Sequence, residues 1–410
     1  MIVDADYTLQ ANFAIDQRTL VVSRTAGGVV TSPGQGTFQY DHGGQVTLQA
    51  KADPLFEFVG WRGSIFANVN PYPFTMNADY TIKACFESVL DALYVDDNAP
   101  GDPGPGDPNV SDPNENGTKE HPFDMVQEAI DVAKDRAKVI VRPGTYLETI
   151  DLLGKSIELN GLNSDDPNIV AFPVIDGQGK DIVVRCTQRE DPNCLLTGFV
   201  ITGGQGRLAG GILCMGSSPT VLNCLIVGNR ATQPDGGGGV YCQDSNAVFL
   251  NCTIAGNYGG TQGAGLCFKD SQAVVANSIV WDNGPTEIQA VGPIQPVITY
   301  TDVAGGWTGL GNMNADPLFA MPGYWANPND LTKAVAASDP AAVWVPGDYH
   351  LMSTAGRWDP VAKAWITDAL TGPCIDAGDP LSPVGAEPIP NGNRINMGVH
   401  GGTSQASLSQ

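Results

Sequence analysis

Apolar and polar positions recur in register along residues 197–283, in three segments of nearly constant spacing. Gly211–Cys214 corresponds to Gly239–Cys242 and then to Gly265–Phe268, so equivalent positions return after 28 and then 26 residues. Short apolar stretches alternate with Gly, Asn and Asp, which favours brief strands joined by tight turns. A fixed period with the same residue types in the same places predicts a stacked solenoid of β-strands.

The repeated positions separate into an interior and a set of turns. In a parallel coil each residue lies about 4.8 Å from its equivalent in the next rung, so inward columns must be apolar throughout. The expected inward columns are Ile212/Val240/Leu266, Val221/Val248/Val274 and Ile226/Ile254/Val280. Hydrogen-bonded asparagine ladders are expected at the turns, formed by Asn223/Asn251/Asn277 and Asn229/Asn257/Asn283. Tyr300 continues the first of these two columns.

A second, longer repeat occurs at the N-terminus. Residues 3–13 return at residues 76–86 with an offset of 73. Residues 1–13 are therefore expected to be the tail of a preceding β repeat, and residues 14–90 one complete small β module. Since the chain begins inside a repeat, we expect it to be part of a longer multi-module protein.

The rest of the chain divides where the pattern changes. Residues 91–121 are rich in Asp, Pro and Gly and are expected to be an acidic linker. Apolar residues from Phe123 to Ala137 follow at helical spacing, which predicts a helix of about four turns that covers the first rung. Residues 122–306 are assigned to the coil with this helix. Residues 307–410 lose the period, hold five of the seven Trp, and are expected to form an irregular C-terminal cap.

Charge and hydropathy exclude several classes of partner. The net charge of −23 argues against nucleic acid and against an anionic membrane surface. It also disfavours a polyanionic glycan unless a cation or a local basic patch intervenes. No apolar run is long enough to span a membrane, and Met1–Asp4 does not begin a signal peptide.

The nine Cys suggest metal or redox chemistry until their columns are compared. Cys214 is expected to stack on Cys242, and Cys224 on Cys252, at interior positions that small apolar groups fill. No Cys-x-x-Cys pair is present to hold zinc. We expect mostly free, buried thiols, with Cys186–Cys194 as the bridge if one forms.

Two resemblances add a family to this pattern. Phe56–Trp61, followed by Met76–Asp79, resembles the divergent bacterial repeat related to the internalin B-repeat, a family of small β modules in secreted and surface proteins. Residues 92–410 resemble the right-handed parallel β-helix family, which includes the pectate lyases. The tail, with Asp316–Phe319 and Cys374–Gly378, resembles the C-terminal end of exported bacterial β-helix proteins.

These resemblances imply an all-β fold: a right-handed parallel β-helix with an N-terminal capping helix and an irregular C-terminal cap, preceded by a small β module. They also imply a location outside the cell or on the bacterial cell surface. We expect the protein to be a monomer.

Outward positions that break the repeat are candidates for chemistry. Two carboxylates fall in one column on adjacent rungs, next to a lysine and a tyrosine, and an Arg and an Asp are in register ahead of the same strand. Stacked carboxylates raise each other's pKa or attract a cation, which suits a glycosidase acid or a lyase with a Lys or Tyr base. The alternative is a solvated turn. The candidate catalytic residues are Lys269, Asp244, Asp270, Tyr241, Arg207 and Asp235.

Two further sets of residues could bind a ligand. Trp faces can stack on sugar rings, which makes Trp281, Trp307, Trp325 and Trp358 candidate carbohydrate-binding residues, unless they form the core of the cap. Closely spaced carboxylates can hold Ca²⁺, which makes Asp96, Asp97 and Asp102 candidate ligands, unless the segment is a solvated linker. The sequence requires no cofactor.

Two functions remain open. Family analogy favours an extracellular protein that binds and cleaves a polysaccharide, as a lyase or a glycoside hydrolase. However, the Asn-Thr-Asp, Asp-Asp and Gly-His-Gly pattern of the polygalacturonases and the basic cluster of the pectate lyases cannot be placed in this sequence. The alternative is a non-catalytic surface module for adhesion, glycan binding or display, which the preceding repeats favour.

Overall fold

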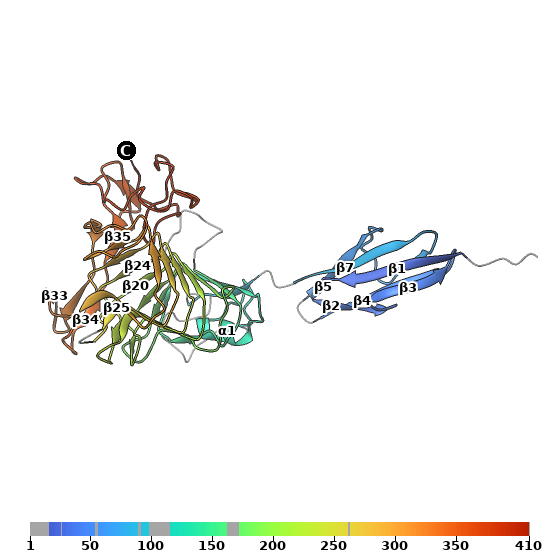
Figure 1. Cartoon of the computed structure of the whole chain (residues 1–410), viewed down its shortest axis with the longest axis horizontal. Coiled ribbons are helices and arrows are strands. Elements are labelled where there is room, and N and C mark those ends of the chain that lie inside the picture. Colours follow the sequence, from blue (N-terminus) through green and yellow to red (C-terminus); the bar gives the residue numbers. More distant parts are fainter. Residues whose placement is uncertain are drawn as a thin grey trace, which may run out of the picture. The chain divides into compact units, whose positions relative to one another are not determined.

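The structure is a computed structural model that describes residues 16–25, 27–53, 56–88, 92–97, 115–161, 172–260 and 263–409. It divides into two compact units, Met1–Asp91 and Ala92–Gln410 (Figure 1). The expected tail of a preceding repeat, residues 1–13, lies outside the described residues.

The first unit is a small all-β module. One sheet has the strand order β3-β1-β7-β5 and the other β2-β4-β6. Alternating buried and exposed positions in β4 place Val46, Leu48 and Ala50 in the core, as the alternation in the sequence predicts. The core also contains Trp61, which is fully buried. The strands are β1 Gln17–Arg24, β2 Gly28–Ser32, β3 Gly36–Asp41, β4 Gln45–Ala52, β5 Phe56–Gly63, β6 Tyr72–Thr75 and β7 Tyr80–Ser88.

The second unit is a parallel β-solenoid with three long sheets, so the predicted fold is confirmed. Sheet 1 contains β8 Leu93–Val95, β9 Lys138–Val141, β12 Glu158–Asn160, β15 Leu195–Thr197, β19 Thr220–Leu222, β23 Val248–Leu250, β26 Val274–Ala276 and β29 Val297–Thr299. Sheet 2 contains β10 Thr145–Tyr146, β13 Val174–Asp176, β16 Val200–Thr202, β20 Leu225–Val227, β24 Thr253–Ala255, β27 Ile279–Trp281 and β30 Asp302–Val303. Sheet 3 contains β11 Ile150–Asp151, β14 Val184–Cys186, β18 Ile212–Met215, β22 Gly237–Gln243, β25 Ala264–Lys269 and β28 Thr286–Val291.

The start of the solenoid differs from the sequence prediction in two ways. Strand β8 lies in the expected linker, and it pairs in parallel with β9. Helix α1, Val126–Val132, is shorter than predicted, because Ala133 is already extended and the chain turns toward β9. The helix still covers the first rung, where it contacts β8, β9 and β11 and buries Val126, Ala129 and Ile130.

The register corrects one interior column. Val221 pairs with Phe249 and then with Val275, whereas Val248 and Val274 are half-buried outward neighbours of this column. The cause is the one-residue offset that separates inward from outward faces in a strand. The other two expected columns, headed by Ile212 and Ile226, are fully buried as predicted.

The two asparagine columns have different duties. Asn229, Asn257 and Asn283 form the predicted ladder: the Nδ2 of each of the first two donates to the Oδ1 of the next at 3.0 Å. Asn223, Asn251 and Asn277 instead have left-handed φ values of 47°, 51° and 50°. Their side chains point to the C-terminal segment, where Asn223 Nδ2 donates to the Val399 carbonyl at 2.9 Å.

The C-terminal segment lies along the side of the solenoid and also on its last rungs. Phe319, Tyr349 and Met397 pack in one cluster with Leu225 and Ala255 of sheet 2. Its strands are β31 Phe319–Met321, β32 Tyr324–Asn327, β33 Asp330–Ala334, β34 Val343–Val345, β35 Asp348–Leu351, β36 Arg357–Asp359 and β37 Ala364–Ile366. The short strands β17 Gln205–Gly206 and β21 Arg230–Ala231 pair at one corner of the coil.

Candidate functional site

Two adjoining grooves lie where the C-terminal segment meets sheet 2. The larger has a volume of about 660 Å³ and runs over the outward residues of β13, β16 and β20. The smaller has a volume of about 300 Å³. Gln205, Arg230 and Pro340 line both, so these residues mark the junction of the grooves.

Glycine in two successive rungs creates one wall of the larger groove. Gly228 and Gly256 occupy equivalent turn positions with φ of 64° each. A Cβ at either position would overlap the ring of Trp344, so the indole packs directly on the backbone. Trp325 meets Trp344 edge-on at 5.3 Å between ring centroids, and its Nε1 donates to the Gly256 carbonyl at 2.8 Å. The two indoles fix the β32–β34 sheet against the solenoid.

The floor of the larger groove carries both polar and apolar side chains. Val174, Val200 and Leu225 alternate with hydrogen-bonding groups such as those of Asp176 and Thr202. Asp176 is the one carboxylate among the described residues that line this groove, and its Oδ1 accepts a hydrogen bond from the Gln178 amide at 2.8 Å. Apolar patches with a few polar groups among them are typical of a ligand-binding site.

Arg230 is the charged residue at the junction. Its guanidinium carbon lies 3.8 Å from the centroid of the Trp325 ring, and the residue as a whole is 8% exposed. Nη1 donates a long hydrogen bond of 3.4 Å to the Pro340 carbonyl, while Nε and Nη2 have no partner. Burial lowers the pKa of Arg230, although the field of Asp339 raises it. Each buried donor without a partner costs about 1–3 kcal/mol.

Four of the six predicted catalytic residues lie on sheet 3 or at the ends of its strands, namely Tyr241, Asp244, Lys269 and Asp270, whereas Arg207 and Asp235 lie in loops after β17 and before β22. None of the six is among the described residues that line the two grooves. Asp244 and Asp270 do follow equivalent positions of β22 and β25, and Lys269 is exposed at the end of β25. Both Asp residues have left-handed φ, 50° and 47°, in the column that contains Gly216 and Gly292. This conformation is typical of Asp in a tight turn.

Tyr241 points outward from sheet 3, yet it is only 5% exposed. It packs with Ile182, Leu213 and Cys267 under the loop that contains Ala209. Burial and the nearby Asp235 and Asp244 carboxylates raise the pKa of Tyr241 to about 12. A phenol in this state stays protonated at neutral pH.

Arg207 and Asp235 are both exposed, but they are not directly opposite each other. The Arg207 carbonyl accepts from the Gln233 amide at 2.9 Å, and the register then moves by three residues before Ala209 pairs with Gly237. Asp235 lies in the loop that this insertion creates. The catalytic role of the six predicted residues stays a prediction.

Of the four predicted tryptophans, only Trp325 is among the residues that line the grooves. Trp281 is half-buried against the cluster that joins sheet 2 to the C-terminal segment. Trp307 is half-buried, and its carbonyl accepts from Asn312. Trp358 packs edge-on against Trp365 in the β36–β37 hairpin.

The predicted calcium ligands Asp96 and Asp97 have contacts that anchor β8 to the first rungs. Asp96 forms an ion pair with Arg142 at 2.7 Å, and Asp97, which is 4% exposed, accepts from the Thr145 amide at 2.9 Å. Asp102 lies outside the described residues.

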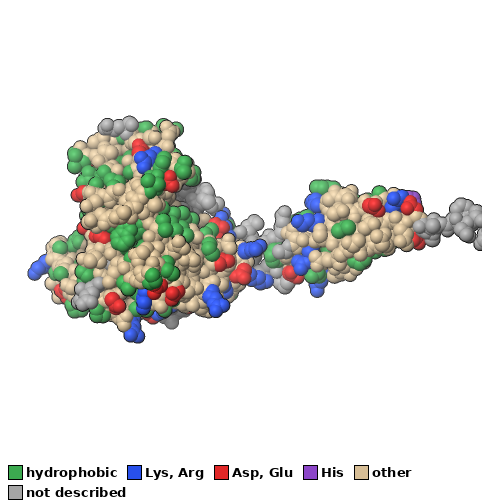
Figure 2. Space-filling model, viewed as in Figure 1, with side chains coloured by type: hydrophobic (Ala, Val, Ile, Leu, Met, Phe, Trp, Pro, Cys, Tyr) green, Lys and Arg blue, Asp and Glu red, His purple; other side chains and the backbone are tan. Residues whose placement is uncertain are grey.

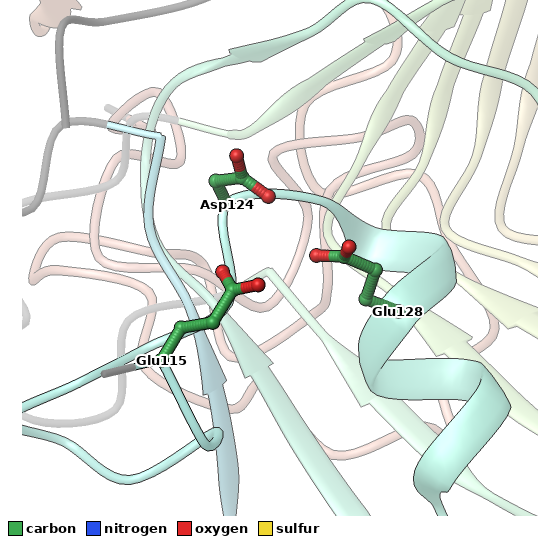
Figure 3. Close-up of side chains that lie close together, drawn as sticks. All are labelled: Glu115, Asp124 and Glu128. Atoms are coloured by element: carbon green, nitrogen blue, oxygen red, sulfur yellow. The ribbon is translucent and has the colours of Figure 1, made fainter. Parts of the chain in front are cut away.

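A different carboxylate group lies close by, formed by Glu115, Asp124 and Glu128 (Figure 3). Their carboxylate oxygens lie within 4.8 Å of one another, close enough to hold one hard cation. Burial, a hydrogen bond that protonated Glu128 donates to Asp124, and the neighbouring charges raise the pKa of Glu128 to about 7. Without a cation, Glu128 is therefore protonated in about half of the molecules near neutral pH.

All nine cysteines are free, as predicted, and all except Cys85 are buried. Cys186 stacks on Cys214 and Cys242 in the interior of sheet 3, so Cys186 does not bridge to Cys194. Burial raises the pKa of Cys194 and Cys224 to about 12 each. These thiols fill the core.

The geometry defines a parallel β-solenoid whose grooved side faces its own C-terminal segment. Two family models match the chain: the divergent InlB B-repeat domain over residues 18–90 and the right handed beta helix region over residues 175–304. The chain therefore combines an InlB-like repeat with a right-handed β-helix region. Neither a curated protein nor a solved structure gives a significant match.

Sequence reasoning missed Arg230 and Trp344. Arg230 follows the ladder residue Asn229, in a column whose next members are Tyr258 and Gly284. The residue type in this column changes from rung to rung, and this change was the sequence signal that could have indicated a functional position. The surroundings of Arg230 are formed by Trp325 and Pro340, about a hundred residues later in the chain. No local sequence pattern indicates that these two residues pack on the rung of Arg230.

Proposed function

We propose that the second unit is a glycan-binding module of a surface or secreted protein, and that the glycan lies in the larger groove. The β-helix fold is consistent with polysaccharide-active proteins, and both matched families are often extracellular. No helix within the described residues is long and apolar enough to cross a membrane.

The observation that carries the proposal is the lining of the groove. It crosses at least three rungs, β13, β16 and β20, so several successive units of a polymer can contact equivalent positions. Trp325 and the outward Val and Leu side chains offer apolar contact, and Gln178, Thr202 and Gln205 offer hydrogen bonds.

The same lining favours binding over hydrolysis. Glycoside hydrolases use two carboxyl groups on either side of the scissile bond, at about 5–9.5 Å from each other. The described residues of the groove supply one, Asp176, and the carboxylates of Asp244 and Asp270 are on sheet 3. The surface of this unit seen in Figure 2 is mostly uncharged, with single acidic and basic side chains spread over it, which suits a neutral glycan better than a polyanion.

A polysaccharide panel with matched variants tests the proposal. The chain is run through gels that contain neutral or acidic polysaccharides, and the products are assayed in parallel for new reducing ends and ultraviolet absorbance. We expect retardation by at least one glycan and no products. Gln205→Ala combined with Thr202→Val should abolish the retardation, whereas Gln243→Ala on sheet 3 should not change it. Product release, or equal loss in the control, contradicts the proposal.

A further inference from the structure

The junction of the two grooves has the properties of an anion site. Arg230 contributes a positive charge there, with its Cζ over the Trp325 ring at 3.8 Å from the centroid. Among the described residues it has no ion-pair partner within 4.0 Å, and two of its three nitrogens have no hydrogen-bond partner. The residue is 8% exposed, and both of these nitrogens are buried.

Arg230 has one neighbour in its column on each of the two adjacent rungs. Gln205, Arg230 and Tyr258 occupy one column at the corner of the coil, and all three line the smaller groove. Their amide, guanidinium and phenol groups can each donate a hydrogen bond toward a bound oxygen. The column therefore places neutral donors on either side of the cation.

Among the described residues, the side chain of Arg230 has one hydrogen-bond partner, the Pro340 carbonyl. This bond, from Nη1 to the Pro340 carbonyl, is long at 3.4 Å. A carboxylate or sulfate offers two oxygens that match the fork of a guanidinium, and the resulting bonds are shorter and stronger than a bond to a neutral carbonyl. The anion would replace the Pro340 carbonyl and supply a partner for Nη2.

We propose that Arg230 binds an isolated carboxylate or sulfate carried by an otherwise neutral glycan. The inference rests on the proposed glycan binding and names the class of glycan. A single buried cation can neutralise one anionic group, but the net charge of −23 opposes a glycan charged at every residue. The negative charge of Asp339, whose field acts on Arg230, also repels further anionic groups of a polyanion.

Calorimetric titration of the whole chain with four oligosaccharides of equal length tests this inference. The probes are a neutral hexose oligosaccharide, the same compound with one C6 oxidised to a carboxylate, the same compound with one sulfate ester, and a fully uronate oligomer. We expect at least one of the two monoanionic probes to bind about tenfold more tightly than the neutral probe. The fully charged oligomer should bind more weakly than the preferred monoanionic probe.

Matched variants assign the preference to one residue. Arg230→Gln should remove it, so that the neutral and the monoanionic probes bind with equal affinity, and Arg230→Lys should retain part of it because the charge remains without the fork. Lys333→Gln, which removes the same charge from exposed β33, should retain it fully.

The outcomes separate the two proposals. Equal affinity for the neutral and monoanionic probes overturns the inference but supports glycan binding, and no binding of any probe overturns both. Tightest binding of the fully charged oligomer also overturns the inference. All of these outcomes are measured on the wild-type chain. The test therefore holds even if Arg230→Gln fails to fold.

Discussion

At the scale of single residues, the two asparagine columns have different hydrogen-bond partners and different structural roles. Asn229, Asn257 and Asn283 bond to one another in the interior, whereas Asn223 and Asn277 hold the C-terminal segment. The sequence predicts that both columns are structural, because Asn recurs in each. It could not separate them, since the partners of the second column lie more than a hundred residues away.

The ladder makes Asn257 a sensitive position. Its side chain satisfies the Ile226 carbonyl and the Asn229 amide, both buried. Asn257→Ala should lower the free energy of unfolding by about 2–4 kcal/mol, because these groups lose their partner inside the coil. Urea denaturation followed by circular dichroism measures this. Asn246→Ala, at an exposed turn, should cost under about 0.5 kcal/mol; equal costs would contradict the ladder's role.

Glu148 gives the stability of the second unit a pH dependence. Its carboxylate accepts from the Val126 and Gln127 amides at the start of α1, yet burial raises its pKa from 4.5 to about 7. Between these values the folded unit holds a proton that the unfolded chain releases, so the free energy of unfolding falls as the pH rises. The full effect is up to about 3 kcal/mol.

Glu148→Gln keeps the shape and one acceptor oxygen but cannot titrate. The difference in stability between pH 5 and pH 8 should therefore be smaller in this variant than in the wild type. Urea midpoints across that range measure it. An unchanged slope would show that Glu148 is ionised throughout.

At the scale of elements, the side wall of the groove depends on contact between a sheet and a glycine column. The β32–β34 sheet attaches through Trp344, which lies on Gly228 and Gly256. A glycine at the same place in successive rungs is typical of a turn. Only the tertiary structure shows the second reason for these two glycines, which is that the Trp344 indole leaves no room for a side chain.

Two glycines with nearly the same backbone conformation isolate this contact. Gly256 has φ of 64° and meets Trp344, whereas Gly216 has φ of 60° and nothing within 4 Å of an added Cβ. Gly256→Ala and Gly216→Ala share a backbone cost of about 1–2 kcal/mol. Gly256→Ala should cost about 1–3 kcal/mol more and weaken glycan binding, because it displaces the wall. Equal unfolding free energies would contradict this packing.

At the scale of the whole molecule, the sequence predicts the solenoid, the free thiols and the first β module, because their signals are local and periodic. It does not predict the groove, which forms where residues 324–345 return to rungs made by residues 174–230. The sequence predicts a catalytic site at the outward polar residues of sheet 3, because these positions break the repeat. They lie at turns, where Asp244 and Asp270 adopt left-handed conformations.

The division of the chain assigns binding to one unit. Each unit has its own compact core, and both grooves are lined by residues of the second. Residues 92–410 alone should therefore bind the glycan with an affinity within about twofold of the whole chain. Residues 16–88 alone should show no binding in the same titration. Binding by the first unit would require a second site.

The location of a bound saccharide tests the central claim most directly. A crystal structure of the chain with an oligosaccharide selected from the panel should show sugar rings across β13, β16 and β20, next to Trp325 and Arg230. Sugar bound instead on sheet 3, beside Tyr241, Asp244 and Lys269, would contradict this account and return the candidate site to the positions where the repeat is broken.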